Sequence, residues 1–203
     1  MRECWWPLGA RNLARKIVRE CVTCTRIKGP VIILNRKGRG ARTMKAYICL
    51  FVCLTTRAIH LELVTSLTSN DYILALKRFM SRRGKPELLL SDNGRTFVGA
   101  EKEFQNFLSA NESKFTNQLS SDGIEFRFIP PYSPHFGGLW ESGVRSCKYH
   151  LRRIVGNARL TYEEFYTVLT QVEAVLNSRP LSPLSSDPAD LSPLTPGHFL
   201  IGR

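Results

Sequence analysis

Acidic residues and long apolar stretches are both scarce in this chain of 203 residues. The longest apolar run, residues 46–54, has the length of a strand and falls well short of the roughly 20 residues that a membrane-spanning helix needs. Basic residues follow soon after Trp5 and Trp6, so the N-terminus lacks the apolar core of a secretion signal. We therefore expect no contact with a membrane and an intracellular location.

The cysteines also argue against a secreted protein held together by disulfides. A chain of this length, with no secretion signal and no regular cysteine spacing, is not expected to be held together by a disulfide framework. A reducing compartment fits the six cysteines better, and these are Cys4, Cys21, Cys24, Cys49, Cys53 and Cys147.

The charge balance is strongly positive. The chain has 29 Lys and Arg residues against 17 Asp and Glu residues, which gives a net charge of +12 and an isoelectric point near 9.8. Such an excess attracts polyanions, and nucleic acid is the usual partner. A solvated basic surface with no partner is the alternative at this point. Because 43% of the residues are hydrophobic, the chain can bury a core beneath that surface.

Hydrophobic periodicity predicts an α/β fold. We expect a basic amphipathic helix over residues 9–24 and a second helix over residues 69–83, with a capping residue at its start. Apolar and β-branched runs predict strands, and two more helices are predicted after residue 138. The strands are expected at 31–34, 47–54, 58–64, 88–90 and 124–129, and the later helices at 139–155 and 161–178. This order indicates a mixed sheet with helices packed against it.

Two carboxylates are placed where such a fold could bring them together. Asp92 follows the strand at 88–90 in a Ser-Asp-Asn-Gly turn, and Glu141 lies early in a helix after Gly138. Sites in open α/β sheets form at the carboxyl ends of strands. A pair of carboxylates there could hold divalent metal ions for phosphoryl transfer. Taken singly, Asp92 could instead make an Asx turn, and Glu141 could stabilise the start of its helix.

The helix that begins near residue 139 carries a row of charges. Glu141, Arg145, Lys148 and Arg152 recur at intervals of four, three and four residues, which aligns them on one helical face. An acid followed by cations suits a DNA groove, with the acid on a metal ion and the cations on phosphates. The alternative is a Glu141–Arg145 pair on a solvated face.

Several segments together resemble the integrases of long-terminal-repeat retrotransposons, most closely those of the BEL/Pao type. The most specific segment is Pro-His-Phe-Gly-Gly-Leu-Trp-Glu at residues 134–141. The Ser-Asp-Asn-Gly turn at residues 91–94 also matches. The others run nearly from end to end, at residues 45–54, 58–63, 74–79, 83–86, 97–100, 128–131, 148–152, 173–180 and 194–200.

The resemblance implies an RNase H-like core with three acidic metal ligands. The second and third of these would be Asp92 and Glu141, holding Mg²⁺ during 3′-end processing and strand transfer. DNA would be the partner, the chain would form a homo-oligomer on DNA ends, and it would act in the nucleus. Residues 29–180 would form the core, residues 1–28 a short helical remnant of a zinc-binding module, and residues 181–203 an extended tail rich in Pro and Ser.

The chain departs from the family pattern in two places. Counting back from Gly29 and Pro30, the first acid should fall at Arg26, so this ligand is missing. We interpret the loss as an internal deletion or a skipped exon, and Glu62 is the only nearby substitute. Cys21 and Cys24 resemble the cysteine half of a His-His-Cys-Cys zinc module. The two histidines of that module are missing, and we do not expect bound zinc.

Three functions follow from these observations. The first is an integrase core that binds DNA but has impaired catalysis because the first acidic ligand is lost. The second is a working metal-dependent nuclease or integrase that recruits an acid from elsewhere. The third is a domesticated DNA- or protein-binding module without enzymatic activity. Binding to phosphates falls steeply with salt, whereas binding to a protein need not, so salt dependence separates the first from the third.

Overall fold

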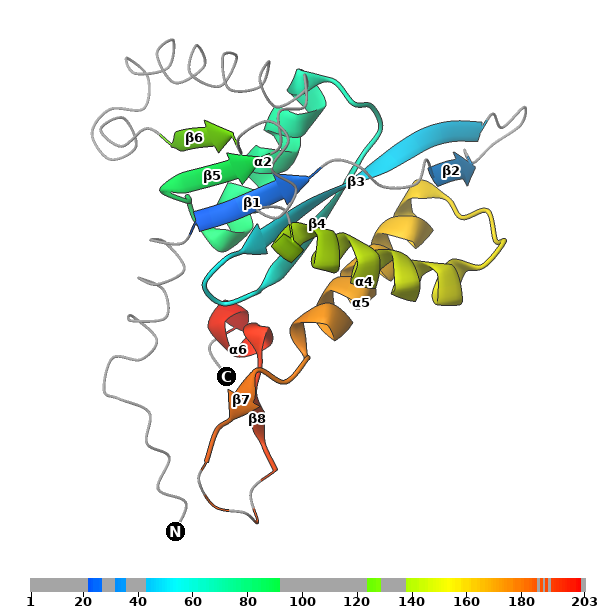
Figure 1. Cartoon of the computed structure of the whole chain (residues 1–203). Helices are drawn as coiled ribbons and strands as arrows, with labels where there is room; N and C mark the ends of the chain where they lie inside the picture. Colours follow the sequence, from blue (N-terminus) through cyan, green and yellow to red (C-terminus); the bar gives the residue numbers. More distant parts are fainter. Residues whose placement is uncertain are drawn as a thin grey trace.

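This computed structural model describes residues 22–26, 32–35, 43–91, 124–128, 138–185, 187, 189 and 191–201, with the backbone alone for residues 22–26, 128 and 201. The described residues form a mixed sheet with helices on both faces (Figure 1). This is the predicted α/β arrangement. A small hairpin and a short helix follow it towards the C-terminus.

Six described strands make up the main sheet. β3 is the longest, and β4 pairs antiparallel with one of its edges. Along the other edge, β2 pairs with the beginning of β3 and β1 pairs with its end. β5 then lies parallel to β1, and β6 parallel to β5. The bounds are β1 Val22–Arg26, β2 Ile32–Asn35, β3 Thr43–Cys53, β4 Ile59–Val64, β5 Leu88–Ser91 and β6 Glu125–Phe128.

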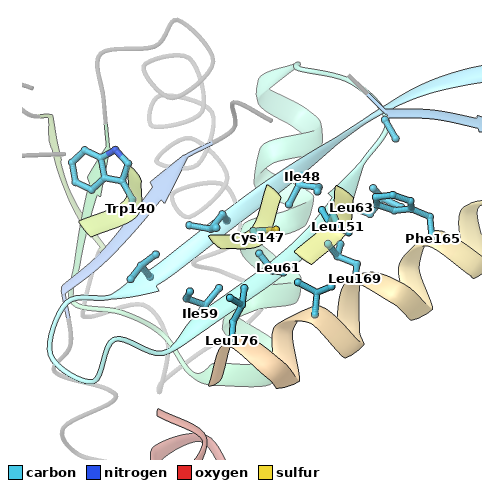
Figure 2. Packing of buried hydrophobic residues seen from close by; sticks show 14 of the residues in the cluster. Ile48, Ile59, Leu61, Leu63, Trp140, Cys147, Leu151, Phe165, Leu169 and Leu176 are labelled. Carbon is cyan, nitrogen blue, oxygen red and sulfur yellow. The ribbon is translucent and has the colours of Figure 1, made fainter. Parts of the chain in front are cut away.

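The helices divide between the two faces because the side chains of β3 alternate. Leu50 and Val52 face α4 (Gly138–Val155) and α5 (Tyr162–Asn177), whereas Cys49 and Phe51 face α2 (Ser69–Arg83). Figure 2 shows the first of these cores, where apolar side chains of α4 and α5 meet those of β3 and β4. None of the described helices is long and apolar enough to cross a membrane.

Polar side chains cap the N-termini of α2 and α5. Thr68 is the N-cap of α2, one residue before the expected start, and its hydroxyl accepts a hydrogen bond from the Asp71 backbone N–H. Thr161 and Glu164 form a capping box at the start of α5, each accepting from the other's backbone N–H.

β1 replaces part of a predicted helix. The helix expected over residues 9–24 is wrong for its last three residues, and the rest of it lies outside the described residues. Residues 22–26 instead pair with β3 on one side and β5 on the other. Without them, two neighbouring strands would present unpaired backbone groups in the middle of a sheet, and this cost outweighs a weak helical propensity. β1 thus lies before the boundary expected at residues 28 and 29.

The C-terminal segment is more regular than expected. Residues 181–203 were predicted to be an extended tail, but β7 (Ser182–Pro183) and β8 (Pro193–Leu194) pair as a small hairpin. Helix α6 (Pro196–Ile201) follows, and the prediction is wrong for these residues. Thr195 precedes α6, and its hydroxyl and backbone N–H both lie within hydrogen-bonding distance of the His198 ring. This contact fixes the first turn of α6. The helix is too short for apolar periodicity to reveal it.

Two side chains of α5 protect the outer edge of β4. Asn177 accepts a hydrogen bond from the Ile59 N–H at 2.8 Å and donates one to the Ile59 carbonyl at 2.7 Å. Glu173 accepts from the Leu61 N–H at 2.7 Å. An unprotected edge strand would offer these groups to another chain. Asn177 and Glu173 therefore make hydrogen bonds that a neighbouring strand would otherwise make, and they join α5 to the sheet.

Candidate functional site

The predicted row of charges lies on the outer face of α4. Glu141, Arg145 and Arg152 are exposed and Lys148 is partly buried. The opposite face is buried and contains Trp140, Gly143, Cys147 and Leu151. The predicted alignment on one helical face is thereby confirmed. Four side chains that run along an exposed helix, one acidic and three basic, form a surface that an extended polyanion can contact.

Helix α4 lies close to β3 and β1. A Cβ atom at Gly143 would be only 3.5–3.6 Å from side-chain atoms of Val52, Ile59 and Leu50, so the start of α4 approaches the sheet closely. In the β1–β3 register, Val52 and Leu50 are the partners of Cys24 and Arg26. α4 also contacts β1 itself. Helix α4 therefore packs over β3 and also contacts β1.

The carboxyl ends of β1 and β5 meet at the same edge of the sheet. Thr25 is the parallel partner of Ser91, the last residue of β5. Asp92 follows Ser91 directly but lies outside the described residues. β5, which ends one residue before Asp92, and α4, which carries Glu141, thus both contact β1.

β1 carries no carboxylate. Its sequence is Val-Thr-Cys-Thr-Arg, and Arg26, the residue expected at the first acidic position, is the last of the strand. Among the described residues, no group of three or more His, Cys, Asp and Glu side chains could hold a metal ion. Of the three positions expected to be acidic, the described residues therefore include one acid, Glu141. A second position, Arg26, is a cation.

Glu62 is not available as a substitute ligand. It is fully buried on the α2 face of β4, whereas Glu141 is on the opposite side of the sheet. One carboxylate oxygen lies 2.6 Å from Arg78 Nε, and the other lies 3.1 Å from Arg82 Nη1 and 3.0 Å from His60 Nε2. Both oxygens are committed to cationic or hydrogen-bonding partners.

His60 joins Glu62 to a second buried acid, Glu173 on α5. His60 Nδ1 lies 3.4 Å from Glu173 Oε2, and Arg83 Nη2 donates to Glu173 Oε1 at 2.5 Å. We refer to His60, Glu62, Glu173, Arg78, Arg82 and Arg83 as the buried network. It connects α2, β4 and α5 through charged side chains on the side of the sheet remote from α4. His60 is therefore a structural residue, since no nucleophile among the described residues is paired with it.

The network shifts the pKa values of its members. Burial by itself lowers the pKa of His60, but hydrogen bonds to Glu173 and Glu62 outweigh burial and raise it above its usual value. Burial would raise the pKa values of Glu62 and Glu173, but hydrogen bonds to His60 and the nearby arginines lower both. All three groups therefore favour their charged forms.

The cysteines offer no described nucleophile. Cys49 and Cys147 are free and buried, and burial raises the pKa of Cys147 to about 12 and that of Cys49 well above its usual value. Cys53 is disulfide-bonded, which differs from the expectation of reduced cysteines. Cys21 and the side chain of Cys24, the two residues considered for zinc, lie outside the described residues.

Sequence reasoning missed the roles of Glu173 and Asn177, which were noted only within a matching segment. A signal was present, because both lie on the apolar face of α5 with Leu169, Val172 and Leu176. A polar side chain on a buried helical face must find a partner, and the nearest edge of the sheet supplies one.

The fold is that of retroviral integrase cores. The HTLV-2 integrase catalytic core domain in complex with magnesium (trimeric form) is 17% identical, with a TM-score of 0.56, and the match covers 89% of this chain and 96% of that one. The BIV integrase catalytic core is also 17% identical, with a TM-score of 0.56 over 88% of this chain and 93% of that one. A chain of the simian T-cell lymphotropic virus intasome is 17% identical with a TM-score of 0.62, covering 90% of this chain. Our chain spans 54% of that longer one.

Residues 25–134 match the integrase core domain family, and the chain belongs to that family. Its mixed sheet and flanking helices form the RNase H-like α/β fold that was predicted. The family match begins at residue 25 and therefore includes the last two residues of β1. No curated protein matches the chain.

Proposed function

We propose that this chain is the DNA-binding core of a BEL/Pao-type retrotransposon integrase, and that its capacity for strand transfer is impaired. The observation that carries the proposal is the exposed face of α4, where Glu141 is followed by Arg145, Lys148 and Arg152 on a helix that contacts β1. Family membership and the net charge of +12 support DNA as the partner.

The described residues do not fit the complete magnesium site that the resemblance implies. Glu141 and Asp92 are two of the three expected acids, but β1 ends in Arg26 and contains no acid at all. Glu62 is held by two arginines on the other side of the sheet. Two carboxylates beside a cation would hold Mg²⁺ weakly, because the positive charge repels the ion. We therefore assign no chemical step to this chain.

Without catalysis, the role left to the charged face is phosphate binding. Each cation that neutralises a phosphate releases a counterion, so the logarithm of the binding constant falls with the logarithm of salt concentration, with a slope of about 0.9 per contact. If Arg145, Lys148 and Arg152 each meet one phosphate, replacing all three by Gln should reduce the slope by about 2.7. Glu141 would lie near the expected metal site and would not contact a phosphate.

The test is fluorescence anisotropy of a labelled duplex between 50 and 200 mM salt. Arg152→Gln should lower the slope by about 0.9. A matched control is Lys77→Gln, which removes one cation from α2 on the opposite face of the sheet, and this change should leave the slope unaltered. Binding that does not respond to salt would favour the alternative of a module that contacts a protein partner.

Replacement of Arg26 tests the proposed cause of the impairment. Arg26→Asp restores an acid at the end of β1, next to the strand that leads into Asp92. We expect calorimetric titration with Mg²⁺ to give measurable binding for this variant and little for the unchanged chain. Equal, tight binding by both would show that position 26 is not part of the metal site.

Assembly and location follow from the same proposal. The HTLV-2 core has been solved in dimeric and trimeric forms. We propose that this chain also forms a homo-oligomer when bound to DNA ends, which light scattering with and without duplex would test. Action on chromosomal DNA would require a nuclear location, and imaging of the tagged chain would show whether it reaches the nucleus.

A further inference from the structure

A tyrosine lies at the centre of the outer face of α4. Tyr149 is midway in sequence between Cys147 and Leu151, which places it about 200° around the helix from each of them. Cys147 and Leu151 are buried in the apolar core that Figure 2 shows, so Tyr149 faces away from the sheet. The Tyr149 residue is 54% exposed. An aromatic ring therefore lies among the charged residues that we propose to contact DNA.

The contacts of Tyr149 with described residues come from its own helix. Arg153 Nη1 donates a hydrogen bond to the Tyr149 hydroxyl at 2.5 Å, and the Arg153 guanidinium carbon lies 5.2 Å from the ring centroid. The His150 ring lies edge-on to the Tyr149 ring, with centroids 5.3 Å apart. Neither apolar core of the described residues includes Tyr149. The packing of α4 on the sheet therefore does not require this ring.

Four cations surround Tyr149 on the helix. They are Arg145, Lys148, Arg152 and Arg153, each within four residues of it. Residues 145–153 contain no Asp or Glu. None of the four cations makes an ion pair with a described carboxylate, in contrast to the arginines of the buried network. The charge around the ring is therefore complementary to an external anion rather than to an acid in the described part of the fold.

An exposed ring among such cations suits a single strand of nucleic acid. A nucleobase has a flat π-face that stacks on an aromatic side chain, while its phosphates meet nearby cations. In a closed duplex, neighbouring base pairs cover these faces and leave only the base edges exposed in the grooves. Arg145 and Arg153 each lie about 6 Å along the helix axis from Tyr149, one before it and one after it. They are therefore placed to meet the phosphates on either side of a stacked base.

We propose that Tyr149 stacks on an unpaired base of the DNA, while Arg145 and Arg153 bind the phosphates that flank this base. The inference rests on the proposed DNA-binding function and names the form of DNA that α4 prefers, which is a duplex end with a single-stranded overhang rather than a blunt duplex. The hydrogen bond from Arg153 orients the ring before DNA binds. A ring that is already ordered loses less side-chain entropy when a base stacks on it.

The test compares a labelled blunt duplex with the same duplex carrying a short single-stranded thymine overhang. Fluorescence anisotropy at one salt concentration gives a dissociation constant for each, and the unchanged chain should bind the overhang DNA more tightly. Tyr149→Leu keeps an apolar side chain but loses the π-face, so its affinity for the overhang DNA should fall about 5- to 100-fold while its affinity for the blunt duplex stays the same. Tyr149→Phe keeps the ring and should bind the overhang nearly as well as the unchanged chain does.

Two controls isolate the stacking contact. Tyr162→Leu makes the same change on α5, where the ring stacks on Tyr166 near Arg82 of α2, and it should leave both affinities unaltered. An overhang of abasic nucleotides keeps the phosphates but removes the base faces. The unchanged chain should bind this overhang as weakly as Tyr149→Leu binds the thymine overhang, and Tyr149→Leu should lose nothing further on it. Because Tyr149 is exposed, its variants should keep the thermal midpoint of the unchanged chain.

The outcomes separate this inference from the proposed function. If the unchanged chain binds no DNA, both fail, and the outer face of α4 is left for a protein partner. If it binds both DNAs equally and Arg152→Gln lowers the salt slope, the proposed function stands and the inference alone is overturned. Equal losses of affinity for both DNAs in Tyr149→Leu, or no loss for either, would also overturn it. A loss confined to the thymine overhang, and absent from the abasic one, supports it.

Discussion

Replacing Glu173 by Ala should destabilise the chain far more than an exposed substitution on the same helix. Glu173 is 9% exposed, yet it accepts hydrogen bonds from the Leu61 N–H and from Arg83, and it lies 3.4 Å from His60. Its loss leaves a buried backbone N–H unpaired, which costs about 1–3 kcal/mol. Removing one partner of a buried ion pair costs about 3–5 kcal/mol. Because the Arg83 side chain is 22% exposed and can turn to water, we expect a total of about 3 kcal/mol.

Glu173→Gln separates the two parts of that cost. The amide keeps an oxygen for the Leu61 N–H but loses the charge that faces His60 and Arg83, so we expect a loss of about 1.5 kcal/mol. Glu163→Ala is the matched control, because Glu163 is exposed in the first turn of the same helix, where its loss should cost at most about 1 kcal/mol.

Urea unfolding at neutral pH measures all three variants, with the midpoint shift converted through a common denaturant slope. The expected order of destabilisation is Glu173→Ala, then Glu173→Gln, then Glu163→Ala. If Glu173→Ala were no more destabilising than Glu163→Ala, the edge of β4 would not depend on α5. If Gln and Ala at position 173 were equally destabilising, the lost charge would be the main contribution rather than the backbone hydrogen bond.

Four further predictions concern stability and reactivity. The raised pKa of His60 means that its contribution to stability is complete below its unfolded pKa and is lost as pH rises through its folded pKa. The urea midpoint should fall over that rise in pH, and His60→Gln should remove this dependence. The lowered pKa values of Glu62 and Glu173 act in the opposite sense, so stability should fall as the solution becomes acidic and they protonate. In the folded chain, iodoacetamide at pH 8 should leave Cys49 and Cys147 unmodified in peptide mass spectra; modification of Cys147 before unfolding would contradict its burial and its pKa of about 12. Gly143→Ala should be tolerated because a Cβ there meets neighbours at 3.5–3.6 Å, whereas Gly143→Leu should cost about 1–3 kcal/mol by overpacking, as measured by urea unfolding.

The elements that local patterns determine were predictable to within a few residues. The hairpin strands, α2, β5, β6, α4 and α5 all occur where apolar alternation or helical periodicity placed them. Thr68 and Thr161 cap α2 and α5 at starts that the sequence marks with polar side chains. The charged face of α4 was predictable for the same reason, because helical spacing alone aligns its residues.

The features that depend on distant segments were not predictable. Residues 22–24 were predicted as the end of a helix, but they form a strand because their backbone groups pair with β3 on one side and β5 on the other. The contact of Arg179 with Arg57 depends on how α5 docks on the sheet, which no local pattern specifies. The position of Glu62 within the sheet was predictable, but its enclosure by Arg78 and Arg82 required the packing of α2.

Part of the candidate site remains a prediction. Asp92 lies outside the described residues, although Ser91 before it pairs with Thr25 of β1. Glu141 lies in the first turn of α4, and α4 contacts β1. The absence of an acid from β1 follows from its sequence, and its consequence for metal binding depends on the register that brings Arg26 beside Leu50.

A joining assay tests the central claim most directly. The purified chain would be incubated with a labelled retroelement-end duplex, a target duplex and Mg²⁺, and DNA binding would be measured in the same samples. We expect a retained protein–DNA complex and no joined product at any Mg²⁺ concentration. Joined product that depends on Mg²⁺ and disappears in Glu141→Gln would show that the site works without an acid on β1, contrary to the account.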